Sequence, residues 1–170
     1  MTRRDFLIKW LAYALALLPI LILALYILPR TPIFGIIPAL LPVAAITVAV
    51  LEGPIGGAGF GLFVGILADA FIPGTPGVMT FVLCFLSFCA GTAARYGVHQ
   101  NLAGCLICSG AGMVLINLAR FLLLWIRGTA EPTVLLLTGL GEVLWSLVFL
   151  PLIYAIFLWV YHRVPKTTVL

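Results

Sequence analysis

Long apolar runs separated by short polar connectors dominate this chain of 170 residues. Of its residues, 64% are hydrophobic and 8% are charged, whereas a soluble domain carries about 25% charged residues. Such a chain cannot cover a water-facing surface, so the lipid bilayer is its expected solvent. In lipid the backbone must satisfy its own hydrogen bonds, and these runs lack the alternation of barrel strands. We therefore expect an all-α integral membrane protein.

A transmembrane helix needs about 20 apolar residues, and six segments meet this requirement. They are Phe6–Leu28, Ile33–Leu51, Pro54–Ile72, Pro76–Tyr96, Asn101–Ile126 and Thr133–Tyr161. The connectors between them are short, which predicts antiparallel neighbours. The predicted fold is a bundle of about six transmembrane helices that forms a single domain over residues 1–170.

Three of these segments leave an alternative open. Pro38 and Pro42 interrupt the second one, which is then two half-helices or a shallow re-entrant piece, and five spans replace six. The last segment is long enough to be tilted or broken near Pro151. The basic start and the apolar run after it fit a secretion signal. Because no small-x-small cleavage site follows the run, we expect a retained transmembrane helix.

Lysine and arginine residues gather at one end of the predicted bundle. With six spans, that end collects Arg3, Arg4, Lys9, Arg95, Arg163 and Lys166, and the other end collects Arg30 and Arg127. Because cytoplasmic loops carry the excess of basic residues, we expect both termini in the cytoplasm. The sequence contains no basic stripe with interleaved aromatic residues, so the lipid bilayer and not nucleic acid is the expected partner.

Three ionisable residues lie within apolar runs: Asp69, Arg120 and Glu142. Such residues should face protein or water and be paired. Their depths are similar, and Asn117 lies about one turn from Arg120 on the same helix face. We expect a buried polar cluster in which Arg120 pairs with Glu142 or Asp69. This cluster either only locks the helix register or lines a ligand or partner contact.

A stripe of glycines leads to Asp69. Gly57, Gly61 and Gly65 recur every four residues, and small residues at this spacing let another helix approach closely in lipid. We expect the third segment to present a helix-contact groove and to be central to the bundle. A turn formed by Pro73, Gly74 and Gly77 follows, and there Asp69 has a second possible role as a cap for backbone amides.

No pattern in the sequence indicates catalysis, a metal or a cofactor. Cys105 and Cys108 form a single CxxC spacing without a histidine in the same run, whereas zinc needs about four such ligands. We interpret these cysteines as packing residues and expect no enzymatic activity. A small-molecule ligand is not expected either.

The glycine-rich stretch GFGLFVGILADAFIPGTPGVMTF, residues 59–81, resembles the rod shape-determining protein MreD family. In that family a G-x-x-x-G-x-x-x-D helix leads into a Pro/Gly turn and a glycine that opens the next helix. Those places are occupied here by Gly61, Gly65, Asp69, Pro73, Gly74 and Gly77. The stretch LLTGLGEVLWSLVFLPLIYAIFLWVYHRV, residues 136–164, resembles the last helix of the family, although Glu142 maps to no family position.

This resemblance implies a fold similar to the S-components of energy-coupling-factor transporters. It implies a non-enzymatic scaffold of the elongasome, which acts in cell shape and side-wall peptidoglycan synthesis. The expected partner is MreC, and through it MreB and the RodA–penicillin-binding-protein pair. The expected location is the bacterial cytoplasmic (inner) membrane.

The alternative is the substrate-binding S-component of an energy-coupling-factor vitamin transporter. Ala12 and Ala16 form an A-x-x-x-A stripe of the kind that S-components dock with. In that case Asp69, Asn117, Arg120 and Glu142 would line a pocket open to the outside. Neighbouring genes discriminate the two: MreB and MreC favour the scaffold, and transporter ATPases favour the S-component.

Overall fold

The regular elements of the chain are helical throughout the part that the structure describes. This computed structural model describes residues 3–30, 36–71, 77–96, 101–126 and 132–163, without the side chains of 3–7, 123–126, 132, 134 and 135. Its α-helices are α1 (Arg3–Ile22), α2 (Leu40–Glu52), α3 (Pro54–Phe71), α4 (Val78–Tyr96), α5 (Leu102–Ile126) and α6 (Pro132–Arg163). A π-helical turn, Leu23–Ile27, and a 3₁₀ turn, Leu28–Arg30, extend α1.

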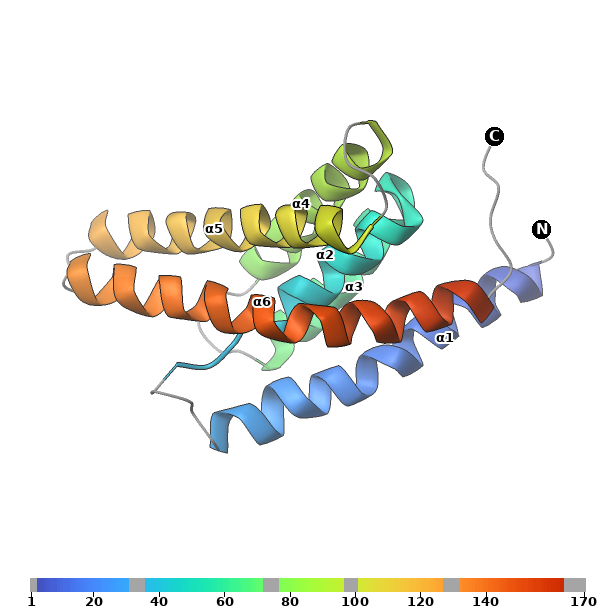
Figure 1. The fold of residues 1–170 in the computed structure, drawn as a ribbon, viewed down its shortest axis with the longest axis horizontal. Coiled ribbons are helices and arrows are strands. Elements are labelled where there is room, and N and C mark those ends of the chain that lie inside the picture. Colours follow the sequence, from blue (N-terminus) through green and yellow to red (C-terminus); the bar gives the residue numbers. More distant parts are fainter. Residues whose placement is uncertain (1–2, 31–35, 72–76, 97–100, 127–131, 164–170) are drawn as a thin grey trace.

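Five of these helices are long and apolar enough to cross a membrane, and the chain is a multi-pass membrane protein. The spans are Ile8–Arg30, Pro54–Phe71, Val78–Tyr96, Leu102–Leu122 and Leu136–Arg163. Helix α1 begins and α6 ends at the same end of the bundle (Figure 1). The predicted all-α membrane bundle is confirmed, with α2 as its one short member among the described helices.

Helix α2 has only 13 residues, about 20 Å, and is shorter than the roughly 30 Å of hydrocarbon in a bilayer. The two prolines explain its late start. Inside a longer helix, Pro42 would remove the hydrogen bond to residue 38, but in the first turn its missing N–H costs nothing. The helix therefore begins at Leu40, and the weak second segment of the sequence becomes a shortened helix.

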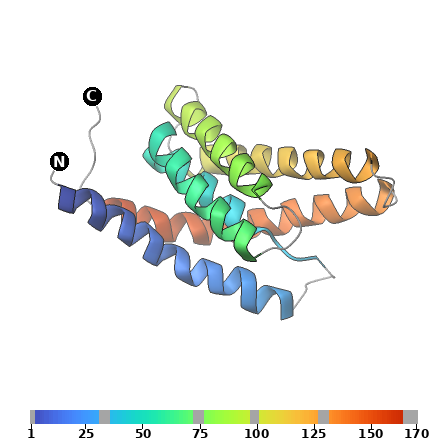
Figure 2. The ribbon, with the colours of Figure 1, turned by 180° about the vertical axis from the view of Figure 1, so that it is seen from behind.

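Helix α2, and not α3 as the glycine stripe suggested, is the centre of the bundle. Every residue of Leu40–Leu51 is buried, because α2 is apolar on all its faces and contacts α1, α3, α4, α5 and α6. Helices α3 and α4 pack along each other on one side of α2, and α5 and α6 form a second antiparallel pair (Figures 1 and 2).

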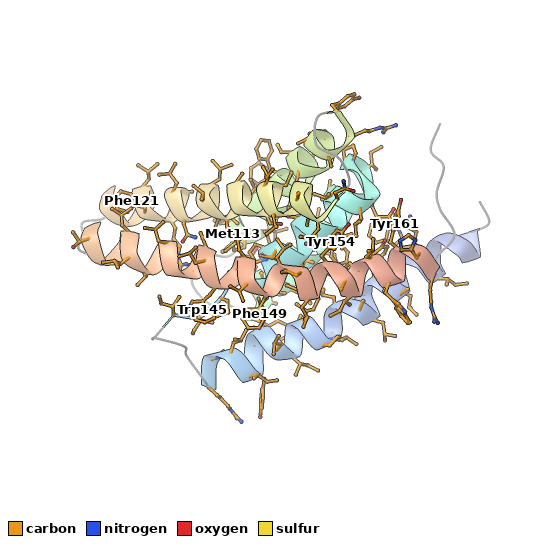
Figure 3. The ribbon with its side chains drawn as sticks, in the orientation of Figure 1. Met113, Phe121, Trp145, Phe149, Tyr154 and Tyr161 are labelled. Carbon is orange, nitrogen blue, oxygen red and sulfur yellow. The ribbon has the colours of Figure 1, made fainter. Side chains whose placement is uncertain are left out.

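Helices α5 and α6 are longer than α2, α3 and α4. Helix α5 has 25 residues and α6 has 32, and α6 continues through Pro151 without a break. Met113 lies where α5 passes the central helices, and Phe121 lies farther along α5, toward the end that projects beyond α3 and α4 (Figure 3). The outer part of this hairpin is therefore surrounded by fewer helices of its own chain.

Candidate functional site

The glycine stripe of α3 lies against the chain's own helices. A Cβ added at Gly61 would lie 2.7 Å from the carbonyl oxygen of Leu83 and 2.5 Å from the Oγ of Ser87, both on α4. A Cβ at Gly57 would meet Ala49 of α2, and one at Gly65 would meet the backbone of Thr80. The close helix contact predicted for this stripe is therefore intramolecular. Helices α4 and α2 fill the groove.

Asp69 caps the start of α4. Its carboxylate accepts hydrogen bonds from the backbone N–H of Met79 at 3.3 Å, the backbone N–H of Thr80 at 2.9 Å and the Thr80 hydroxyl at 2.6 Å. Gly77, with φ of +80°, precedes this helix and has no side chain with which to cap it. A carboxylate from the neighbouring helix therefore satisfies the amides that the first turn leaves open.

The other two turn residues named from the sequence, Pro73 and Gly74, lie outside the described residues. Gly77 is described, and its left-handed backbone explains why a residue without Cβ stands there.

Arg120 and Glu142 form one of the two ion pairs that the sequence allowed, and Asp69 is not the partner. One guanidinium nitrogen of Arg120 lies 3.3 Å from Oε2 of Glu142, which joins α5 to α6. Asn117 donates to the carbonyl oxygen of Met113 at 3.2 Å and faces Gly139 of α6. The predicted buried cluster of four is wrong in one member and in its burial, because the Arg120 side chain is 59% exposed. Asp69 belongs to the α3–α4 contact instead, because the unfilled amides of α4 are its nearest donors.

A second ion pair, which is buried, was missed. The Nζ of Lys9 contacts Oε2 of Glu52, and the Tyr13 hydroxyl donates to Oε1 of Glu52 at 2.6 Å. The Lys9 and Glu52 side chains are 6% and 7% exposed. In the sequence, Lys9 counted only as an orienting charge, and Glu52 fell between two predicted segments. Their positions could have revealed the pair. Lys9 lies near the start of the first predicted segment and Glu52 directly follows the second, so antiparallel packing of these segments brings the two residues to the same end.

Aromatic rings surround this second pair. The ring of Tyr13 lies 6.0 Å from that of Phe60 and 6.1 Å from that of Phe157, and Trp10 stacks on Phe60 at 6.3 Å. These rings exclude water from the Lys9–Glu52 contact. They also connect α1 with α3 and α6, so this polar contact is part of the core.

The cysteines and histidines in the described ranges form no metal site. No group of three or more His, Cys, Asp or Glu side chains there is placed to hold a metal ion. The thiol of Cys105 is buried and donates to the hydroxyl of Thr47 at 3.4 Å. This contact agrees with the interpretation of Cys105 as a packing residue.

Helix α1 exposes a regular apolar seam, which the sequence analysis also missed. Its members, each at least half exposed, are Ile8 (59%), Leu11 (70%), Leu15 (64%), Leu18 (50%) and Ile22 (55%). Their spacing alternates between three and four residues, which is the a/d pattern of a helix that packs along one other helix. This α1 seam points away from the rest of the bundle.

A shallow groove of about 200 Å³ lies between α4 and α5. All its lining residues are apolar: Phe81, Val82, Phe85, Leu86, Leu115 and Ile116. Such a surface suits an acyl chain or another apolar side chain. It offers no polar group that would bind a water-soluble substrate.

The comparisons add no relative to this picture. No protein-family model, no curated protein and no solved structure matches this chain.

Proposed function

We propose that this chain is a non-enzymatic scaffold of the bacterial elongasome, related to MreD, in the cytoplasmic membrane. It binds MreC through contacts between transmembrane helices and is linked through MreC to MreB and the RodA–penicillin-binding-protein pair. Both of its termini face the cytoplasm. This proposal rests on the resemblance of residues 59–81 to the family and on one structural observation.

That observation is the α1 seam. Five large apolar side chains with coiled-coil spacing project from one face of α1 and contact no other helix of the bundle extensively. The spacing places these five side chains on one helix face, and their size gives a partner helix a continuous apolar surface to pack along. The seam therefore replaces the glycine stripe, which the chain's own α4 covers, as the proposed docking surface for MreC.

Two structural observations favour the scaffold over the transporter alternative. Ala12 and Ala16 are half-buried and pack against the core of their own chain, so this stripe is not open to a coupling subunit. Asp69 caps α4 and does not join Arg120 and Glu142 in a common pocket. We therefore propose no second function.

The test is purification of the tagged protein from its native membrane in a mild detergent, with identification of the chains that copurify. We expect MreC and cell-wall synthases with the unaltered chain. The double variant Leu11→Trp/Leu15→Trp should lose MreC, because two bulky rings on the seam prevent close helix packing.

The matched control is Val148→Trp/Leu152→Trp on α6, whose side chains are 65% and 54% exposed. This control should retain MreC, because it changes an equally exposed apolar face on a different helix. Recovery of a coupling subunit with ATPases would overturn the scaffold proposal. Equal capture by both double variants would overturn the role of the seam.

A further inference from the structure

The guanidinium of Arg120 is only partly covered by its own chain. Its side chain is 59% exposed, and its one hydrogen bond within the described residues is the 3.3 Å contact with Glu142. A guanidinium has five N–H donors, so most of them remain available. A charge within an apolar span is costly unless water or a polar group meets it, so the open side of Arg120 is a site for a polar group from outside the chain.

One carboxylate oxygen of Glu142 is available as a hydrogen-bond acceptor beside the donors of Arg120. Oε2 of Glu142 contacts Arg120, while Oε1 has no hydrogen-bond partner among the described residues. Side chains lean toward the N-terminus of their own helix. Because α5 and α6 are antiparallel, Arg120 and Glu142 lean toward each other, and both charges meet at one depth. Together they present a cation and an anion side by side.

The apolar groove between α4 and α5 leads to this pair. Ile116 lines the groove, and Arg120 follows it by one helical turn on the same face of α5. Phe81 and Phe85, which are 74% and 59% exposed, form the wall on α4. A groove of about 200 Å³ admits part of an acyl chain. A helix, about 10 Å across, is too wide for it.

The depth of the pair brings it within reach of a lipid headgroup. Helix α5 continues for six residues beyond Arg120, to Ile126. Helix α4 has 19 residues and α5 has 25, so α5 is longer by six residues, about 9 Å. A bilayer that matches the shorter α4 is thinner on this side. A headgroup beside the start of α4 can then reach Arg120.

We propose that Arg120, Glu142 and the α4–α5 groove bind one phospholipid with a zwitterionic phosphoethanolamine headgroup. The guanidinium of Arg120 binds the phosphate. Oε1 of Glu142 accepts a hydrogen bond from the primary ammonium, and an acyl chain lies in the groove. A choline headgroup fits less well, because its quaternary ammonium has no N–H to donate. An anionic headgroup fits less well, because Glu142 repels it.

The experiment is native mass spectrometry of the full chain in mild detergent. Phosphatidylethanolamine, phosphatidylcholine and phosphatidylglycerol with identical acyl chains are added at equal concentrations, and the retained lipids are counted. We expect phosphatidylethanolamine to be retained about twofold to fivefold over phosphatidylcholine, the effect of a partly exposed charge pair.

Two single variants and one double variant separate the two charges. Arg120→Gln should abolish the preference for phosphatidylethanolamine. Glu142→Gln should shift the preference to phosphatidylglycerol, because a lone guanidinium then faces the lipid. The charge-reversed double variant, Arg120→Glu/Glu142→Arg, restores an ion pair and should keep the preference for phosphatidylethanolamine.

Two further variants serve as controls. Arg95→Gln removes an exposed arginine at the far end of α4 and should change nothing. Leu115→Trp fills the groove and should lower the retention of all three lipids without changing their order. Equal retention of the three lipids by the unaltered chain would overturn the proposal and would leave a partner's acidic helix as the group that covers Arg120. Loss of selectivity in Arg95→Gln would also overturn it.

Discussion

The ammonium of Lys9 on α1 contacts the carboxylate of Glu52 at the last residue of α2, with both side chains almost completely removed from solvent. The Tyr13 hydroxyl donates to the same carboxylate. Glu52 ends α2, where the carbonyl end of a helix disfavours a negative charge. The Lys9 ammonium compensates both for this position and for the burial of Glu52. This contact fixes the beginning of α1 to the centre of the bundle.

Removing one partner of this pair should destabilise the protein strongly. We expect Lys9→Met to lower the free energy of unfolding by about 3–5 kcal/mol, because Glu52 would remain buried without its cation. The double variant Lys9→Met/Glu52→Met should recover most of this loss, since no buried charge remains. Thermal denaturation in detergent measures the stability of the single and the double variant. If the double variant lost as much as the two single variants together, the pair would not be coupled.

The glycine stripe should be intolerant of a single methyl group. Gly61→Ala places a Cβ 2.7 Å from the carbonyl oxygen of Leu83, so α3 and α4 must separate. We expect a loss of about 1–3 kcal/mol in the free energy of unfolding. Gly59→Ala is the matched control on the same helix, because its Cβ would lie 3.9 Å from the nearest atom, on Trp10. An equal effect of both substitutions would contradict an intramolecular α3–α4 contact.

The role of Asp69 as a cap predicts different effects for two substitutions. Asp69→Ala should cost about 0.5–2 kcal/mol, because the amides of Met79 and Thr80 lose their acceptor. Asp69→Asn should cost less, since the amide oxygen of asparagine still accepts from the start of α4. If instead Asn lost as much as Ala, the charge of Asp69 and not its cap would be the important property.

A double-variant measurement checks whether Asp69 is separate from the ion pair. The effects of Asp69→Asn and Arg120→Gln should add to within about 0.5 kcal/mol, as expected for sites without shared partners. A larger coupling would restore the four-residue cluster that the sequence suggested.

The common end of α1 and α6 predicts the side on which both termini lie. Arg95 lies in the last turn of α4 and Arg163 ends α6 at that end, while Arg30 lies at the opposite end of α1. Because basic residues favour the cytoplasmic side, single cysteines placed at residues 2 and 168 should both react only with a membrane-permeant maleimide. A single cysteine at residue 129 should react with an impermeant one, and the reverse pattern would invert the topology.

Much of this fold was predictable because the solvent is lipid. Runs of about 20 apolar residues can only be helices there, so the bounds of α3, α4, α5 and α6 follow the predicted segments to within a few residues. The Arg120–Glu142 pair was also predictable. Charges of opposite sign at similar depth on two neighbouring helices have few other partners in a bilayer.

The roles of Asp69 and the glycines depended on local geometry that spacing does not contain. A G-x-x-x-G stripe indicates that some helix approaches closely, but not which one. Only residues 72–77 separate α3 from α4, which makes α4 the neighbour. The positive φ of Gly77 leaves the start of α4 open to Asp69. Helices of the same chain therefore cover the glycine stripe. The exposed seam on α1 could be recognised only after the buried faces were known.

The sequence by itself determined the solvent, the helical class and the approximate span ends, because these depend on the composition and length of local segments. The tertiary structure alone decided that the short α2 is the centre, that Lys9 lies against Glu52, and which apolar faces remain outside. The physical reason is that all helices of a membrane protein are apolar. Hydrophobicity therefore cannot indicate which helix faces are buried and which are exposed. Only close packing and the pairing of the few charges decide this.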